Sequence, residues 1–356
     1  MGYGITSVIA KKTSASRHLI ATAAGAATLL VSSLAMAQND FLTEPASLTL
    51  SPARSAAPAD DTAAQLKKEA GRSEAEQPNY LDAAPAEQPN IHGFFNSPFK
   101  TAYVTPRGLV VQDKGVVWQP IVGLVIPIGD IGPIKGLTFV GGIWNSVDSY
   151  EASANPQTGP WDEMDTFASF SGGIGGGVSL NLTYGEWNSP PHAFTVEHNI
   201  DLKISYDDSK MWGNSGLSLN PYVDLWWAVS GSSTVILGRH GGTGYIEPGI
   251  VPTYTVKGIP DYPLTFTVPM YFSFGPSTYW DAHSTYGHSD FGLTSISANV
   301  SMPLSFIPAR YGHWHADAGV TYDYLINTAL LKSGGLACGN TDRNVVVGSL
   351  GFGIAF

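Results

Sequence analysis

The sequence predicts an all-β fold: a transmembrane antiparallel up-and-down β-barrel of about 12 strands, preceded by a disordered N-terminal segment. Three observations predict it. Apolar and polar residues alternate over long segments, the chain contains 40 glycines and many aromatic residues, and no run of 18 or more apolar residues follows the N-terminal 37 residues. Alternation indicates strands, the composition suits strands joined by turns, and the missing long apolar run excludes helical membrane spans. Any membrane span must therefore consist of strands.

Residues 1–37 have the features of a cleaved secretory signal. An apolar stretch covers 19–34, and Ala35-Met36-Ala37 offers a cleavage site before Gln38. The basic region in front of it contains Lys11, Lys12 and Arg17. The signal carries these three bases and no acids, so its removal changes the formal net charge from −11 to −14. That balance argues against nucleic acid as a partner.

Residues 38–96 are rich in Ala, Pro and Glu and poor in large apolar side chains. Such a segment cannot bury a core, so we expect a disordered periplasmic linker there and a barrel over 97–356. The only cysteine, Cys338, cannot form an internal disulfide. The barrel must therefore be held together by other interactions.

Alternation is most regular in 194–206, 217–230 and 264–275, and in the first of these only His198 interrupts the apolar face. An even number of strands long enough to cross a bilayer is typical of bacterial outer-membrane barrels. The predicted strands are 100–111, 116–128, 136–145, 164–172, 178–186, 194–206, 217–230, 243–256, 264–275, 291–304, 313–325 and 344–356.

The connections between these strands give an independent test. Outer-membrane barrels have short periplasmic turns and longer external loops. If the first strand runs outward, every connection longer than about ten residues lies outside, consistent with that rule. The glycine-rich stretch 172–177 resembles a phosphate-binding loop, but a strand follows it instead of a helix, so a hairpin turn is expected.

The last strand, "NVVVGSLGFGIAF" (344–356), places bulky side chains on one face and mostly small ones on the other. The bulky face suits lipid and the small face suits a barrel interior. The bulky set is Val346, Leu350, Phe352, Ile354 and Phe356. A terminal Phe356 after alternating apolar residues resembles the signal by which the outer-membrane assembly machinery recognises its clients.

Residues 99–356 resemble a class of uncharacterised Gram-negative outer-membrane, porin-like proteins. The resemblance is carried by "TAYVTPRG" in the predicted first strand, "DEMDTFASFSGG" leading into "VSLNLTYGEW", "NPYVDLWW" and the closing "GFGIAF". It implies the barrel architecture and a location in the bacterial cell outer membrane, in contact with its lipid. It brings no catalytic residues.

The inward face of the predicted strands carries many charged residues. Buried charges are costly unless they are paired or hydrated, which predicts a wet interior. The predicted lumen-lining residues are Arg107, Asp165, Glu197, Asp201, Lys203, Asp224, Glu247, Asp317 and Asp323. Acids outnumber bases among them. We therefore expect a narrow passive channel for small hydrophilic solutes with a weak preference for cations, without enzymatic activity or a cofactor.

Three alternatives compete with this interpretation. His313, His315 and Asp317 share one face of a strand, and two His plus a carboxylate could hold a metal ion. The external loop 281–290 contains Ser, His and Asp, the residue types of a hydrolase, but no nucleophile elbow. A closed barrel could also serve as an adhesin or surface receptor through its external loops 146–163 and 326–343.

Overall fold

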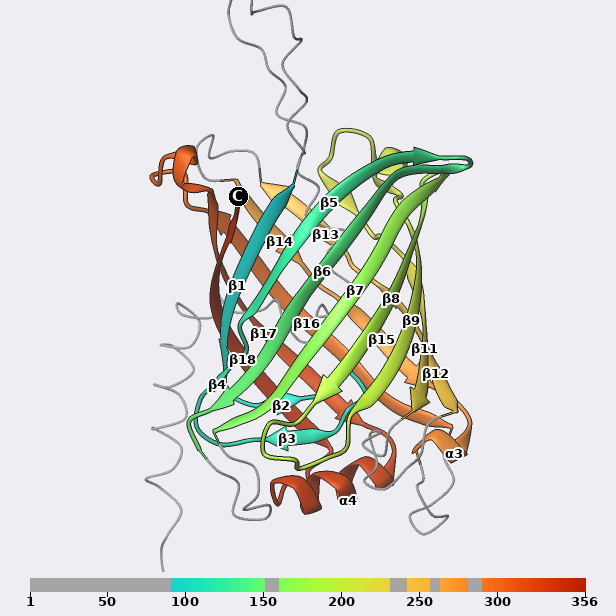
Figure 1. Ribbon diagram of the computed structural model, residues 1–356, viewed down its shortest axis with the longest axis vertical. Helices are drawn as coiled ribbons and strands as arrows, with labels where there is room; N and C mark the ends of the chain where they lie inside the picture. Colours follow the sequence, from blue (N-terminus) through green and yellow to red (C-terminus); the bar gives the residue numbers. More distant parts are fainter. Residues whose placement is uncertain (1–90, 151–159, 231–241, 257–262, 281–289) are drawn as a thin grey trace, which may run out of the picture.

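The computed structural model describes residues 91–150, 160–230, 242–256, 263–280 and 290–356. The predicted signal and nearly all of the predicted linker lie outside these residues. The rest forms a closed antiparallel barrel of 12 strands (Figure 1), which confirms the predicted fold class. The ring closes where β1 (His92–Lys100) pairs with β18 (Asn344–Ala355). Among the described residues, no helix is long and apolar enough to cross a lipid bilayer.

Eight of the barrel strands are continuous, and four consist of two segments each. Besides β1 and β18, the continuous strands are β6 (Ile134–Asp148), β7 (Trp161–Gly175), β8 (Val178–Asn188), β9 (Glu197–Tyr206), β16 (Phe291–Pro303) and β17 (His313–Leu325). The divided strands are β4 (Val117–Trp118) with β5 (Ile121–Ile131), β10 (Leu217–Ser218) with β11 (Tyr222–Ser230), β12 (Thr243–Ile250) with β13 (Thr253–Val256), and β14 (Leu264–Thr267) with β15 (Met270–Phe274).

Each of the four interruptions contains a proline, namely Pro120, Pro221, Pro252 and Pro269. Proline has no backbone N–H to donate, so the ladder is broken at that residue. Its carbonyl remains available, and all four carbonyls accept a hydrogen bond from the neighbouring strand. The donors are the backbone N–H groups of Asn145, Tyr206, Val268 and Ser297, at 2.8 to 3.0 Å. The wall therefore stays closed at these positions.

The two ends of the barrel differ. At the turn end, uppermost in Figure 1, lie the start of β1, the C-terminus and two short helical turns, η2 (Ser209–Trp212) and η3 (Ala309–Tyr311). At the opposite, loop end lie the long connections, as predicted. The elements in them are β2 (Tyr103–Val104), β3 (Val110–Gln112), α3 (Ser277–Trp280) and α4 (Thr328–Ala337).

The predicted alternation of faces is confirmed along the wall. On β8, for example, Leu182 points outward with 48% of its surface exposed, whereas Thr183 points inward and is 1% exposed. The same pattern places Leu350, Phe352 and Phe356 of the C-terminal segment on the outside. An outward apolar band around an inward polar face is the arrangement that a lipid bilayer requires of a barrel.

The first predicted strand is wrong. β1 covers His92–Lys100, so it begins within 38–96, the segment assigned to the linker, and ends at the first residue of the predicted strand 100–111. Residues 101–116 instead fold into the barrel at the loop end. The error has a physical reason. Val104, Leu109 and Val110 are buried among other side chains inside the barrel. Apolar residues in such a hairpin give a sequence pattern similar to that of a wall strand with one face toward lipid.

Leu182→Arg places a charge on the lipid-facing side of a central wall position. We expect it to lower the free energy of unfolding in lipid vesicles by about 2–4 kcal/mol, the cost of a basic residue near the bilayer midplane. The matched control is Ser179→Arg, which places the same side chain on the inward face of the same strand. Urea titration in lipid vesicles measures the free energy of unfolding of both variants. Equal losses in the two variants would contradict the assignment of faces.

Candidate functional site

Residues 101–116 enter the lumen at the loop end, and we call this segment the plug. β2 and β3 pair as a hairpin whose tip is Thr105-Pro106-Arg107-Gly108-Leu109. The N–H of Gly108 donates to the carbonyl of Thr105 at 2.8 Å, closing a tight turn with proline at its second position. Gly108 has φ 93°, and a Cβ there would lie 2.9 Å from Leu330 Cδ1. The tip of the plug therefore requires glycine at this position.

Helix α4 and the residues after it support the plug from the loop end. The helix begins after Asn327, whose side chain accepts a hydrogen bond from the N–H of Ala329 at 2.9 Å. Asn340 Nδ2 donates to Asp113 Oδ2 at 2.9 Å, and Cys338 Sγ donates to the carbonyl of Val110 at 3.5 Å. Burial raises the pKa of the Cys338 thiol to about 11, so it keeps its proton at neutral pH.

Arg107 joins the plug to the wall. Its Nη1 lies 2.5 Å from Glu197 Oε1, and the two residues are 3% and 0% exposed. Its Cζ lies 4.0 Å from the centroid of the Trp187 ring. Trp187 and Glu197 are direct partners on β8 and β9, so one patch of the wall offers both a carboxylate and an indole face. Because an unpaired buried charge is costly, Arg107 and Glu197 depend on each other.

A second contact fixes the base of the plug. Tyr103 donates its hydroxyl hydrogen to Glu163 Oε2 at 2.7 Å, and its ring centroid lies 5.6 Å from that of Trp144. Gln112, opposite Tyr103 in the hairpin, donates to the carbonyl of Tyr150. The plug is thus attached both at its tip and at its base.

Aromatic side chains extend the Arg107 pocket around the lumen. The Trp187 ring centroid lies 6.2 Å from that of Trp226, which stacks on Tyr245 at 5.9 Å with an interplanar angle of 5°. Tyr245 in turn lies 5.2 Å from Tyr279 and 5.6 Å from Trp280, both in α3. All five are buried. The loop half of the barrel is therefore packed around the tip of the plug.

All of the predicted lumen-lining residues lie inside the barrel, and all except Arg107 belong to a wall strand. Arg107 lies inside the barrel but belongs to the plug and not to a wall strand. The buried wall acids are Asp165, Glu197, Asp201, Asp224, Glu247 and Asp323, whereas Asp317 is less enclosed. Lys203 also faces inward, with Nζ 4.2 Å from the centroid of the Tyr222 ring.

Four further charged residues are buried in the barrel that the sequence did not indicate: Lys100, Asp148, Asp162 and Glu163. Lys100 was missed because it stood at the edge of the misplaced first strand; it pairs across the ladder with Ser349. The three acids had been assigned to the loop 146–163. β6 and β7 extend further than alternation alone indicated, and carry them into the wall at the loop end.

Most of the inward acids have a partner. Glu247 Oε1 accepts from the Tyr222 hydroxyl at 3.0 Å, and Asp165 Oδ1 accepts from the N–H of Asn188 at 3.2 Å. Asp201 and Asp224 differ, because within the described residues all four of their carboxylate oxygens are buried without a hydrogen-bond partner. They lie on neighbouring strands, with Asp224 opposite Lys203 on one side and Glu247 on the other.

The lumen is less tightly packed toward the turn end. His315 and Asp317, on β17 near the turn end, are 26% and 15% exposed, compared with 0% for Asp201 deeper in the barrel. Lys203 and Ser205, on the turn-end half of β9, are also half-buried. The inward side chains are therefore more exposed toward the turn end than around the plug at the loop end.

The structure brings together two of the three residues predicted to hold a metal ion. His313, His315 and Asp317 follow each other on β17, but only His315 Nε2 and Asp317 Oδ2 come together, at 3.1 Å. The described part of the chain contains no group of three or more His, Cys, Asp or Glu side chains arranged to hold a metal ion. Residues at positions i and i+2 of a strand can meet, as His315 and Asp317 do, whereas His313 is exposed and the strand rise places it about 13 Å from Asp317. The proposed hydrolase loop, 281–290, lies outside the described residues except for Asp290.

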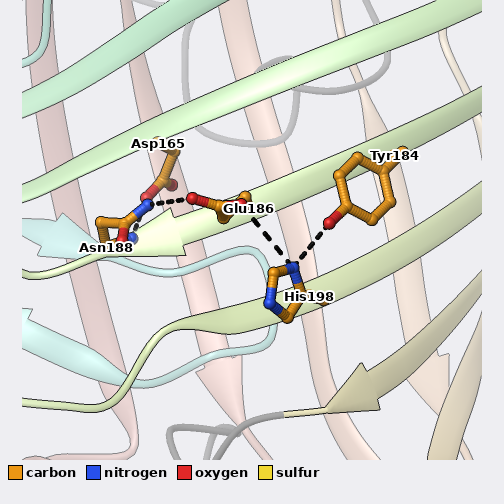
Figure 2. A network of polar contacts seen from close by, with 5 residues as sticks. All are labelled: Asp165, Tyr184, Glu186, Asn188 and His198. Carbon is orange, nitrogen blue, oxygen red and sulfur yellow. Dashed lines mark hydrogen bonds and ion pairs between the residues drawn. The ribbon is translucent and has the colours of Figure 1, made fainter.

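His198, which interrupts the outward apolar face, is part of a polar cluster on the outside of the barrel (Figure 2). The Tyr184 hydroxyl lies 2.6 Å from His198 Nδ1, and Glu186 Oε2 lies 3.8 Å from the same nitrogen. Asn188 Nδ2 donates to Glu186 Oε1 at 3.0 Å, and the backbone N–H of Asn188 reaches Asp165. These outward polar groups thus satisfy one another near the loop end of the wall.

Comparison with known proteins shows similarity in fold only. No family model and no curated protein matches the chain. Among solved structures, the chain is similar to an outer membrane channel from Pseudomonas putida, with 13% sequence identity, a TM-score of 0.43, and coverage of 79% of this chain and 100% of that chain. The NanC porin shares 10% identity at a TM-score of 0.36, covering 74% and 98%. The Salmonella typhi OmpF porin shares 8% at 0.33, covering 75% and 97%.

A double-mutant cycle measures the attachment of the plug. We expect Arg107→Met or Glu197→Gln alone to lower the free energy of unfolding by about 3–5 kcal/mol when the change leaves a buried charge unpaired, and the double variant to lose less than the sum. The control cycle is Lys135→Met with Asp130→Asn, an exposed pair at 2.9 Å that contributes about 1 kcal/mol or less. Similar coupling energies in both cycles would show that Arg107 does not hold the plug.

Proposed function

We propose that this barrel is a narrow passive channel of the outer membrane for small hydrophilic solutes, with a weak preference for cations. The observation that supports it is the charge of the interior. The interior contains the seven predicted acids and three more, Asp148, Asp162 and Glu163. These acids outnumber the three strong bases that also lie inside, Lys100, Arg107 and Lys203. Carboxylates inside the barrel cannot contribute to an adhesive surface on its outside, whereas in a pore they attract cations.

The arrangement of the acids supports a route through the barrel. A cation entering at the turn end would first meet the partly exposed Asp317 and then the row formed by Glu247, Asp224 and Asp201 on adjacent strands. Carboxylates in this row lower the energy of a cation and raise that of an anion. The plug closes the far end of this route. Conduction therefore depends on movement of the plug, which makes the described arrangement the constricted state of the channel.

The adhesin alternative receives less support. One of its two proposed binding loops, 326–343, contains α4, whose residues Ala329, Leu330, Ser333 and Gly334 are buried against the plug and the wall. That loop therefore packs against the plug at the loop end of the barrel. The other loop, 146–163, lies partly outside the described residues, and its described ends belong to β6 and β7. We propose no catalytic role.

Export and assembly belong to the same proposal. Cleavage after Ala37 would release the chain into the periplasm, and Phe356 would present the C-terminal segment to the assembly machinery. The structure is compatible with that role, since the Phe356 side chain is exposed on the outside while its N–H donates to the carbonyl of Gly93 at 2.9 Å. The aromatic side chain is thus accessible at the seam where the barrel closes.

Single-channel recording in planar bilayers tests the function. Neutralising one carboxylate about 6 Å from a permeating ion removes about 0.7 kcal/mol of attraction for a cation in water, and the same amount of repulsion for an anion. Asp224→Asn and Glu247→Gln should therefore each lower the cation-to-anion permeability ratio about tenfold. The matched control, Asp130→Asn, makes the same change on an exposed carboxylate of the β5–β6 hairpin and should leave the ratio unaltered. The absence of conductance steps from refolded protein, in wild type and in Arg107→Ala alike, would refute the channel.

A further inference from the structure

We propose that the pocket around Arg107 is a binding site for small solutes that bear a guanidinium or amidinium group, and that the side chain of Arg107 occupies it when the plug is seated. This inference names a solute class for the channel and in that respect rests on the function proposed above. The binding itself can be measured without any conductance. It starts from the geometry of the pocket, which contains the elements of a guanidinium receptor.

Two features of the pocket select a planar cation. Glu197 supplies a carboxylate at hydrogen-bond distance from Nη1, and Trp187 supplies an aromatic face 4.0 Å from Cζ. A guanidinium can donate to a carboxylate along its edge while its flat face covers an indole, whereas an ammonium offers no flat face and is more strongly hydrated. Both contacts are desolvated, which strengthens them relative to contacts in water.

The receptor groups belong to the wall, so they persist when the plug moves. Trp187 and Glu197 are held opposite each other by the β8–β9 ladder, and Trp226 and Tyr245 stack behind them on β11 and β12. Only the guanidinium comes from the plug. Departure of Arg107 would leave a preformed pocket in which Glu197 and Trp187 have lost their contacts with a guanidinium, and a free guanidinium ion of the same shape would restore those contacts.

The pocket also contains polar groups that Arg107 leaves unused. Within the described residues, the indole N–H of Trp187 and the hydroxyl of Tyr245 are buried without a hydrogen-bond partner. A separate solute is not tethered to the plug and can place its own polar atoms against these wall groups. Asp201 is the next acid on the same inward row of β9, again without a hydrogen-bond partner, and offers a second cation contact on the way to the turn end.

Arg107 and the solute exclude each other because they use the same carboxylate and the same ring face. A ligand that binds only the state with the plug displaced must increase the population of that state. A guanidinium solute would therefore both occupy the constriction and help to open it. A solute without that group would meet a seated plug.

Chemical rescue tests the inference. Arg107→Ala removes the two methylene groups and the guanidinium beyond Cβ, a fragment equivalent to ethylguanidinium. We expect calorimetric titration of the refolded variant to show binding of ethylguanidinium, with binding of ethylammonium and of neutral ethylurea at least about tenfold weaker. In the Arg107→Ala, Glu197→Gln double variant, the affinity for ethylguanidinium should fall about tenfold or more.

The outcomes separate this inference from the channel proposal. A refolded Arg107→Ala barrel that binds none of the three compounds, or all three alike, overturns the site even if it conducts ions. Selective binding supports the site even if no conductance is seen. If Arg107→Ala fails to refold, amide hydrogen exchange of the wild-type protein tests the inference instead. Faster exchange of the plug amides in the presence of ethylguanidinium than in the presence of ethylammonium supports it. Equal exchange rates in the two compounds overturn it.

Discussion

Every backbone N–H and carbonyl that faces hydrocarbon must find a partner within the protein, and the rest of this structure depends on that constraint. The seam between β1 and β18 satisfies it by turning an open sheet into a ring. The prolines at the four strand interruptions show how strictly it is met, because the carbonyl of each still accepts a hydrogen bond from the neighbouring strand. Once the ring is closed, strand geometry alone sends alternate side chains outward and inward.

Closure creates an interior that the chain then has to fill or hydrate. At the loop end it is filled: the plug, α3 and α4 bring apolar and aromatic side chains against the wall, and the resulting cluster includes Val104, Trp280 and Leu330. At the turn end the inward side chains are more accessible. Among the described residues, this asymmetry follows from the connections, since the segments that fold back inside, such as β2, β3 and α4, belong to the loop end.

Charge connects the two halves of the interior. The wall is rich in carboxylates, and the plug brings one guanidinium to a fully buried one, Glu197. A buried ion pair of this kind adds little net stability compared with apolar packing, but it is very sensitive to the loss of either partner. The same contact can thus hold the plug in place and make its position responsive to a competing cation.

The sequence by itself determined the class of fold, eleven of the twelve wall strands to within their ends, the lipid-facing side of each, and the inward position of acids such as Asp201 and Asp224, because alternation with period two is a local property of the chain. Only the tertiary structure decided that 101–116 lies inside the barrel, that Arg107 pairs with Glu197, that Glu163 is buried, and that His315 pairs with Asp317. A hairpin packed inside a barrel and a strand in its wall both alternate, and which of them a segment becomes depends on contacts with residues far away in the sequence, such as Leu293 and Leu330.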